Sequence, residues 1–249
     1  MVKLSVIALH GIGTQSKGFY NDLKSGLKKQ FAQRSVTDYD FTGFLYASIA
    51  QAGQDDLWKR ISKTTISLDT IRRFLLFYFG DAGAYSYKFD TPGSIYQTIH
   101  QKLGRAMKKA LANLAPDGTL VVLAQSFGAF IVSNFLWDLF KRPNTSPLRE
   151  SVSKKLKLMI TTGCNIPLLV GGLADIKAFK KPNREFLWHN YYDKDDILGW
   201  PLRPLSDSYR KLVKQDIAVN TGLPILSHLN YWKNNKLLDA IADNIKDVM

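Results

Sequence analysis

The segment around Ser126 constrains the fold of this chain more than any other feature. An apolar, β-prone run over 121–124 stops just before Ser126, and a strongly apolar, helix-like run follows it. The pattern predicts a strand, a sharp turn with the serine at its apex, and a helix. Small residues at Ala124 and Gly128 would let strand and helix pass close together, with the serine in a strained backbone conformation. A plain Ser-Gly turn after a buried strand is the alternative interpretation.

A second strand-to-loop transition lies near the start of the sequence. Residues 3–9 form a buried-strand pattern that ends in the H-G-I-G sequence of residues 10–13. A glycine loop after a strand can turn backbone N–H groups toward a pocket, so the N–H groups of Ile12 and Phe127 are candidate donors to an oxyanion. A simple strand-to-helix turn is the alternative. Neither G-x-G-x-x-G nor Gly-Lys-Ser/Thr is present in this loop, which argues against a phosphate site.

Acidic residues cluster after a later strand pattern. Residues 184–192 are typical of a strand, and they run directly into Asp193, Asp195 and Asp196. A carboxylate just past a strand end is well placed to orient a histidine. Asp195 is more simply interpreted as a solvated loop charge.

One histidine follows this acidic cluster. Residues 216–220 predict a last short strand, and the loop after it carries His228. The order along the chain is therefore Ser, Asp, His, which is the order that a strand–serine–helix turn of this kind requires. His189 fits a packed strand position, and His100 fits the flank of a helix over 94–114. The three histidines that precede the cluster are His10, His100 and His189.

Together these motifs resemble those of the α/β-hydrolase superfamily. They are similar to lipase-like and esterase-like bacterial members that pair an H-G-x-G loop with a late N-x-Y-D-x-x-D segment, here residues 190–196. The resemblance covers 1–249 and implies one α/β-hydrolase domain, with a mostly parallel central sheet flanked by helices and a helical insertion before the nucleophile strand. The sequence departs from the pattern at Ala124, where glycine is commoner, and at Gln125, where relatives often carry histidine. These departures concern substrate preference more than catalysis.

The resemblance implies a serine hydrolase that cleaves carboxylic esters through an acyl-enzyme, without a cofactor or a metal. Ser126 would be the nucleophile and His228 its base. Asp196 resembles the position where relatives place the orienting acid, and Asp193, nearer the strand end, is the alternative. Thioesterases, amidases, peptidases and acyltransferases use the same groups, so the sequence does not separate these activities. Three further residues would support the site without transferring protons: His10, Gly11 and Gln125.

The net charge of +13 raises a different class of function, binding to nucleic acid or to anionic lipid. The basic residues form short, separate clusters at 108–109, 154–157 and 180–181, and no nucleic-acid-binding motif accompanies them. Nucleic acid is therefore a disfavoured partner, whereas weak association with anionic lipid stays open. A non-catalytic binding protein with a basic surface would be expected to lack one member of the triad, and here all three residue types are present.

Composition favours a single enzyme domain in the cytoplasm. Hydrophobic residues make up 45% and charged residues 22% of the 249 residues, as in globular proteins. Cys164 has no second cysteine to pair with, so a packed thiol is expected. The sequence opens directly into a strand pattern and has neither a signal-peptide pattern nor an apolar run long enough to span a membrane. Nothing in it indicates an oligomeric state.

The segment 54–89 exceeds what a minimal sheet-and-helix core needs. It is rich in aromatic residues, and it lies before the nucleophile strand, where an insertion can reach the catalytic edge. Two interpretations stay open, a cap that lines an apolar acyl pocket and an ordinary flanking helix of the core. The aromatic residues that motivate the cap include Phe77, Tyr78, Phe79, Tyr85 and Tyr87.

Overall fold

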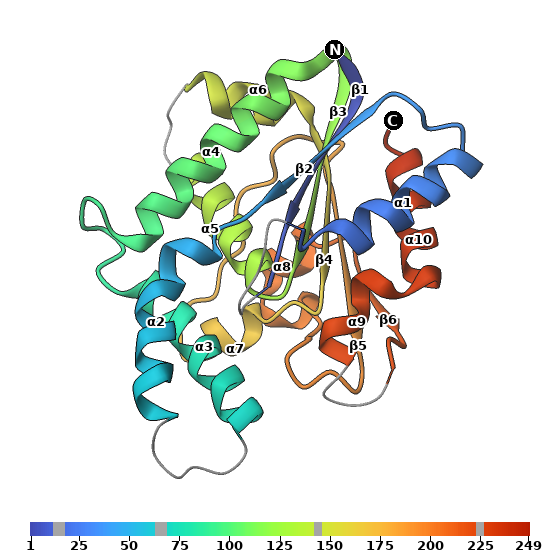
Figure 1. Cartoon of the computed structure of the whole chain (residues 1–249). Helices are drawn as coiled ribbons and strands as arrows, with labels where there is room; N and C mark the ends of the chain where they lie inside the picture. The colour runs from blue at the N-terminus through green and yellow to red at the C-terminus, as the bar shows by residue number, and fades with distance from the viewer. Residues whose placement is uncertain (12–17, 63–68, 142–145, 223–226) are drawn as a thin grey trace.

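The computed structural model describes residues 1–11, 18–62, 69–141, 146–222 and 227–249. At its centre is a six-stranded sheet with the order β2-β1-β3-β4-β5-β6, in which every neighbouring pair is parallel (Figure 1). The strands are β1 (Val2–Leu9), β2 (Tyr39–Phe44), β3 (Leu114–Gln125), β4 (Leu156–Thr162), β5 (Leu187–Asp193) and β6 (Gln215–Val219). The parallel sheet predicted from the sequence is confirmed.

Helices cover both faces of this sheet. The helices α1 and α10 pack together on one face, and α4 and α5 lie on the other, beside β1 and β3 (Figure 1). The α-helices are α1 (Asn21–Gln33), α2 (Ala47–Ile61), α3 (Asp69–Ser86), α4 (Ile95–Asn113), α5 (Phe127–Lys141), α6 (Pro147–Lys155), α7 (Ile166–Val170), α8 (Asp207–Leu212), α9 (Ser227–Asn230) and α10 (Asn235–Lys246). Two 3₁₀ turns complete the described elements, η1 (Arg203–Leu205) and η2 (Tyr231–Lys233).

The central strand β1 shows why its sequence is continuously apolar rather than alternating. Leu4, Val6 and Ala8 point into the core under α1 and α10, whereas Ile7 and Leu9 point into the core under α4 and α5. All five are buried, because a strand covered on both faces has no solvent side. The two cores together hold the carboxyl ends of β1, β3, β4 and β5 at one edge of the sheet.

The predicted strand boundaries differ from the structure by a few residues. The pattern at 184–192 corresponds to β5, which begins three residues later, at Leu187. Here the side chain of Asn183 donates to the carbonyl oxygens of Ser153 and Leu156 and accepts from the backbone N–H of Glu185. These bonds hold a turn before the strand, and they explain its later start.

The expected helical insertion before the strand that leads to Ser126 is present as α2 and α3, which lie side by side and pack on α4 (Figure 1). The helix α2 begins at Ala47, ahead of the predicted segment 54–89, of which residues 63–68 lie outside the described residues. The aromatic residues of α3 divide into two groups. Tyr85 is buried with its ring edge-on to that of Phe127, whereas Phe79 is 66% exposed and contributes to neither core.

Candidate active site

The strand, turn and helix predicted around Ser126 are present. The strand β3 ends at Gln125 and α5 begins at Phe127, which leaves Ser126 alone between them with a φ of +53°. This left-handed conformation is strained for a residue with a β-carbon, and such strain is concentrated at functional sites. The backbone N–H of Ser126 donates to the carbonyl of Thr162 at 2.9 Å, which fixes the turn against β4.

Gly128 explains why the turn needs a glycine two residues after the serine. A β-carbon at this position would collide with the carbonyl oxygen of His10 and would lie 3.0 Å from the Leu9 β-carbon. The first turn of α5 therefore passes directly over the end of β1. This contact places Ser126 beside the His10–Gly11 segment, as the sequence pattern indicated.

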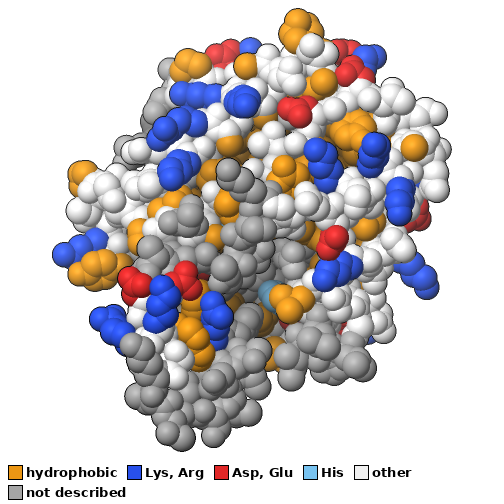
Figure 2. All heavy atoms as spheres, in the orientation of Figure 1, with side chains coloured by type: hydrophobic (Ala, Val, Ile, Leu, Met, Phe, Trp, Pro, Cys, Tyr) orange, Lys and Arg blue, Asp and Glu red, His pale blue; other side chains and the backbone are white. Residues whose placement is uncertain are grey.

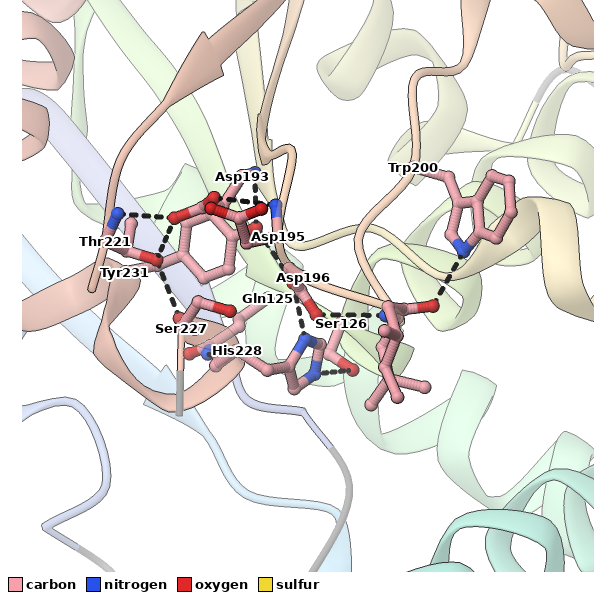
Figure 3. Close-up of polar contacts among 12 residues, drawn as sticks. Gln125, Ser126, Asp193, Asp195, Asp196, Trp200, Thr221, Ser227, His228 and Tyr231 are labelled. Atoms are coloured by element: carbon pink, nitrogen blue, oxygen red, sulfur yellow. Dashed lines mark hydrogen bonds and ion pairs between the residues drawn. The ribbon is translucent and has the colours of Figure 1, made fainter. Parts of the chain in front are cut away.

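The structure brings three of the predicted site residues together. Nε2 of His228 lies 2.8 Å from Oγ of Ser126, and its Nδ1 lies 2.8 Å from Oδ2 of Asp196 (Figure 3). An ionised carboxylate can only accept, so Nδ1 carries the ring proton and Nε2 accepts from the serine hydroxyl. All three side chains are largely buried, which strengthens these hydrogen bonds.

Asp196 is held as an anion by three groups. Burial alone would raise the pKa of Asp196, but the hydrogen bond from His228 and its electrostatic attraction, the N–H of Leu198 and the hydroxyl of Tyr231 lower it below its ordinary value. The Leu198 N–H donates to Oδ1 and the Tyr231 hydroxyl to Oδ2, both at 2.9 Å. Burial raises the pKa of Tyr231, so its hydroxyl stays a neutral donor. A carboxylate satisfied in this way fixes the tautomer of the histidine.

A glycine directly after β4 makes room for the hydrogen-bonded pair of Asp196 and His228. Gly163 has a φ of +54°, and a β-carbon there would lie 2.7 Å from the Tyr231 ring, 3.1 Å from Oδ2 of Asp196 and 3.2 Å from Nδ1 of His228. Both the backbone conformation and the crowding favour glycine at this position. The end of β4 therefore forms the floor beneath the Asp196–His228 hydrogen bond.

The alternative acid, Asp193, lies away from His228 and holds the loops around it. Its Oδ2 accepts from the backbone N–H and the hydroxyl of Thr221, and its Oδ1 accepts from the backbone N–H of Asp195 (Figure 3). Asp193 is only 2% exposed. Of the two candidate acids, the structure brings Asp196 and not Asp193 to the histidine. Asp195 is exposed, as expected for a loop charge.

His10 is buried beside the site and hydrogen-bonded within its own segment. Burial lowers the pKa of His10 to about 4, so the ring is neutral near pH 7. Its Nδ1–H donates to the carbonyl of Gly11, and its Nε2 accepts from the backbone N–H of Tyr46 at 3.1 Å. The Tyr46 hydroxyl lies 2.9 Å from the carbonyl oxygen of His10 and 3.0 Å from that of Gly11, and its ring stacks on the imidazole at 3.9 Å. One tautomer of His10 satisfies all of these contacts.

The remaining predicted residues lie as follows. Gln125 donates from Nε2 to the carbonyl oxygen of His228 at 2.8 Å, which ties the histidine segment to the end of β3. Phe127 is the first residue of α5, so its backbone N–H has no acceptor within the helix. Ile12, the other predicted oxyanion donor, lies outside the described residues, and Gly13 lies there with it.

A pocket opens beside the serine. It has a volume of about 130 Å³, and its polar members include His10, Gly11, Gln125, Ser126 and His228. Its apolar wall comes from three distant parts of the chain: Phe19, Tyr78, and Leu229 with Trp232. Asp22 and Lys233 also line it, and both of these side chains are exposed. The helix α3 therefore reaches the pocket through Tyr78, whose pKa is raised by burial to about 12, so that its hydroxyl stays neutral.

Comparison with known proteins identifies the fold to which this architecture belongs. No protein-family model and no curated protein matches the sequence. Among solved structures, polyneuridine aldehyde esterase superposes with a TM-score of 0.50 at 9% identity, over 98% of this chain and 100% of the esterase. The chain has the α/β-hydrolase fold. A putative hydrolase of the alpha/beta superfamily from Xanthomonas campestris pv. campestris superposes with a TM-score of 0.48 at 10% identity, over 96% of this chain and 98% of the other.

Within this α/β-hydrolase fold, sequence reasoning missed two tyrosines at the site. Tyr231 follows His228 by three residues, so helical spacing could have placed both side chains on one side of a turn. Tyr46 follows β2, the edge strand beside β1, and nothing local in the sequence connects it to His10. Both hydroxyls donate to groups that contact Ser126 or His228. They extend the site beyond the predicted set.

Within the described residues, no helix has the length and the apolar character needed to cross a membrane. The same part of the chain contains no cluster of three or more His, Cys, Asp or Glu side chains arranged to hold a metal ion. Cys164 is fully buried, and burial raises the pKa of its thiol to about 12, in keeping with a packed side chain.

Proposed function

We propose that the protein is a serine hydrolase that cleaves carboxylic esters through an acyl-enzyme. The observation that carries this proposal is the unbroken hydrogen-bond chain from Ser126 through His228 to Asp196, with 2.8 Å at each step, which starts from a serine strained at φ +53°. A serine, a base and an orienting acid within hydrogen-bond reach are the requirements for nucleophilic acyl transfer.

The reaction has two halves. Oγ of Ser126 attacks the ester carbonyl carbon while its proton moves to Nε2 of His228, and the protonated histidine then gives this proton to the departing alkoxide. A water molecule next attacks the acyl-enzyme. His228 takes one proton from the water and returns it to Oγ, which releases the carboxylic acid. Asp196 stays ionised throughout and stabilises the imidazolium in both halves.

The pocket wall supports an ester with an apolar acyl group. Tyr78, Trp232 and Phe19 present aromatic surface beside Ser126, and a pocket of about 130 Å³ is small. Such a wall discriminates between substrates by the apolar area that each buries, about 0.8 kcal/mol for each methylene. Thioesters and amides would use the same residues, and in acyl transfer another nucleophile would replace the water that attacks the acyl-enzyme. Parallel assays with matched ester, thioester and amide substrates separate these alternatives.

The proposal is tested by labelling with a fluorophosphonate, which reacts only with an activated serine. One equivalent is expected to attach to Ser126, and peptide mass analysis locates it. Two other buried serines are the internal controls, Ser133 in α5 and Ser227 next to His228. Labelling of either control serine, or of none, would overturn the assignment.

We expect Asp196→Asn and Asp193→Asn to differ in their effects on turnover and on stability. Asp196→Asn should lower kcat by about 10⁴-fold, because an amide can donate to Nδ1 and stabilise the wrong tautomer of His228. Asp193→Asn should leave kcat nearly unchanged and lower the free energy of unfolding by about 2 kcal/mol, because it weakens the charged hydrogen bonds to Thr221. Ester turnover and thermal unfolding of both variants provide the measurement, and the opposite ranking would make Asp193 the acid.

Tyr46 is expected to act as a positioning residue for this chemistry. Its hydroxyl holds the carbonyl oxygens of His10 and Gly11, and a β-carbon at Gly11 would lie 2.9 Å from that of Ser126. In Tyr46→Phe both oxygens lose the Tyr46 hydroxyl, and the Gly11 oxygen keeps only the His10 Nδ1–H. The segment can then shift and bring a carbonyl oxygen toward the pocket, where it would repel an oxyanion. We expect kcat to fall about tenfold with KM little changed, since losing an oxyanion donor outright costs roughly 10²–10³-fold.

Tyr191→Phe is the matched control for Tyr46→Phe. Tyr191 is buried in the core under α10, and its hydroxyl accepts from Asn244 at 2.7 Å, so the change also removes one hydrogen bond from a tyrosine. Thermal unfolding should shift in both variants, but only Tyr46→Phe should slow fluorophosphonate labelling. Equal labelling rates in the two variants would reduce Tyr46 to a structural role.

A further inference from the structure

The helix α4 carries a concentration of positive charge that the proposed chemistry does not use. Lys102, Arg105, Lys108 and Lys109 are all exposed, and the sequence from 91 to 116 contains no acidic residue. Figure 2 shows Lys and Arg side chains gathered at the upper left of this face, where α4 and α6 lie in Figure 1. The adjoining helix α6 adds Lys154 and Lys155.

A groove with an apolar floor runs along this charged helix. One part of it, of about 490 Å³, lies between α4 and α6 and includes Leu111, Pro147 and Leu148. A second part, of about 510 Å³, continues between α4 and α5. The two parts meet at Lys108 and Leu148, which line both. Together they follow α4 over 100–112, about 18 Å at 1.5 Å per residue, which matches three turns of another helix.

Two cations of the groove, Arg105 and Lys108, are available to a partner. Within the described part of the chain, Arg105 and Lys108 form no ion pair, whereas Lys154 pairs with Glu150 at 2.7 Å. The acidic side chain that lines the groove's second part, Asp138, lies 3.0 Å from His100 and accepts from the Tyr96 hydroxyl at 2.7 Å. No acid among the described groove residues therefore neutralises Arg105 or Lys108.

The groove is separate from the pocket at Ser126. The two share no lining residue among those that the structure describes. The groove extends to Leu111 near the end of α4, where the chain enters β3, whereas Ser126 follows the opposite end of β3. Changes in the groove are therefore not expected to alter the catalytic hydrogen bonds.

We propose that this groove docks an acidic amphipathic helix of another protein. Apolar side chains of such a helix would pack on Leu111 and Leu148, and its carboxylates would face Arg105 and Lys108, as in other helix-in-groove complexes. A bilayer fits poorly, because none of the large hydrophobic side chains found exposed in the described residues belongs to α4 or α6. Nucleic acid fits poorly too, because half of the groove wall is apolar and offers nothing to phosphates.

The test uses a fluorescent model peptide of about 18 residues, with leucine on one helical face and glutamate on the other. Its binding to the full-length protein is measured by fluorescence anisotropy at low and at physiological salt. We expect saturable binding that weakens with salt, and at least about tenfold weaker binding by the double variant Arg105→Glu/Lys108→Glu. Leu111→Gln should also weaken binding, because the apolar floor contributes.

The matched control is Lys28→Glu/Lys29→Glu, which reverses two exposed charges on α1 at the other face of the sheet. It should bind the peptide as the unchanged protein does. All variants should keep fluorophosphonate labelling at Ser126, so a folding defect or a failure of the proposed chemistry is seen separately. No peptide binding, equal loss in the control, equal binding of a peptide with scrambled leucine positions, or preferred binding of anionic vesicles or duplex DNA would each overturn the proposal.

Discussion

Ser126→Ala is expected to lower kcat for ester hydrolysis by roughly 10⁶-fold and to abolish fluorophosphonate labelling. The change removes the one oxygen that can attack the carbonyl carbon and leaves His228 without a partner at Nε2. Alanine keeps the β-carbon at φ +53°, so the backbone strain is unchanged and thermal unfolding should move little. The loss of activity would therefore be chemical and not structural.

Ser126→Gly sharpens this test, because it removes the nucleophile and the strain together. Glycine adopts a positive φ at no steric cost, so this inactive variant should unfold at a higher temperature than Ser126→Ala. Ser227→Ala, one residue from the histidine, should retain activity. Substantial turnover in either Ser126 variant, at a rate above that of a blank reaction, would show that the nucleophile lies elsewhere.

The sequence predicted those parts of the fold whose signal is local. The apolar runs that became β1 and the end of β3 lie where the patterns put them, and the strained turn at Ser126 follows from a strand and a helix that meet at one residue. Chain order then limited the histidine to His228. These inferences needed only periodicity and order, because a strand buried on both faces and a tight strand-to-helix turn each leave a short, recognisable pattern.

The sequence could not decide matters that depend on contacts between distant segments. Asp193 ends β5 and Asp196 follows in the next loop, three residues later. Their partners, Thr221 for Asp193 and His228 for Asp196, come from distant segments that the local sequence does not place. His100 shows the same limit. It was expected on a helix flank, but its ring lies between Asp138 of α5 and the Tyr85 hydroxyl of α3, at 3.0 and 2.7 Å.

The aromatic segment before β3 was ambiguous for a similar reason. Composition alone predicted either a cap or a core helix, and the structure assigns different residues of α3 to different environments. Tyr78 lines the pocket, Tyr85 packs on Phe127, and Phe79 is exposed. Different faces of one helix contact the pocket, the core and solvent. A count of aromatic residues therefore could not predict which of them lies in which environment.

His228→Ala is the second change for which we expect a very large effect, a fall in kcat of roughly 10⁶-fold, comparable to the loss of the serine itself. The two residues act as one unit, so Ser126→Ala/His228→Ala should be hardly slower than either single variant. His189→Ala is the matched control. His189 is also buried, but it lies in β5 against β4 and β6 and does not line the pocket. It should lose stability and keep most of its activity.

The pH profile gives a readout of His228 that a structural role would not produce. As pH falls, a protonated imidazole cannot accept the serine proton, so kcat/KM should decline on the acid side. Neither of the two nearby groups can cause this limb near neutrality, because the pKa of His10 is lowered to about 4 by burial and that of Asp196 lies below its ordinary value. The residual activity of His228→Ala should therefore lack the limb, while His189→Ala retains it. An unchanged acid limb in His228→Ala would assign the proton transfer to another group.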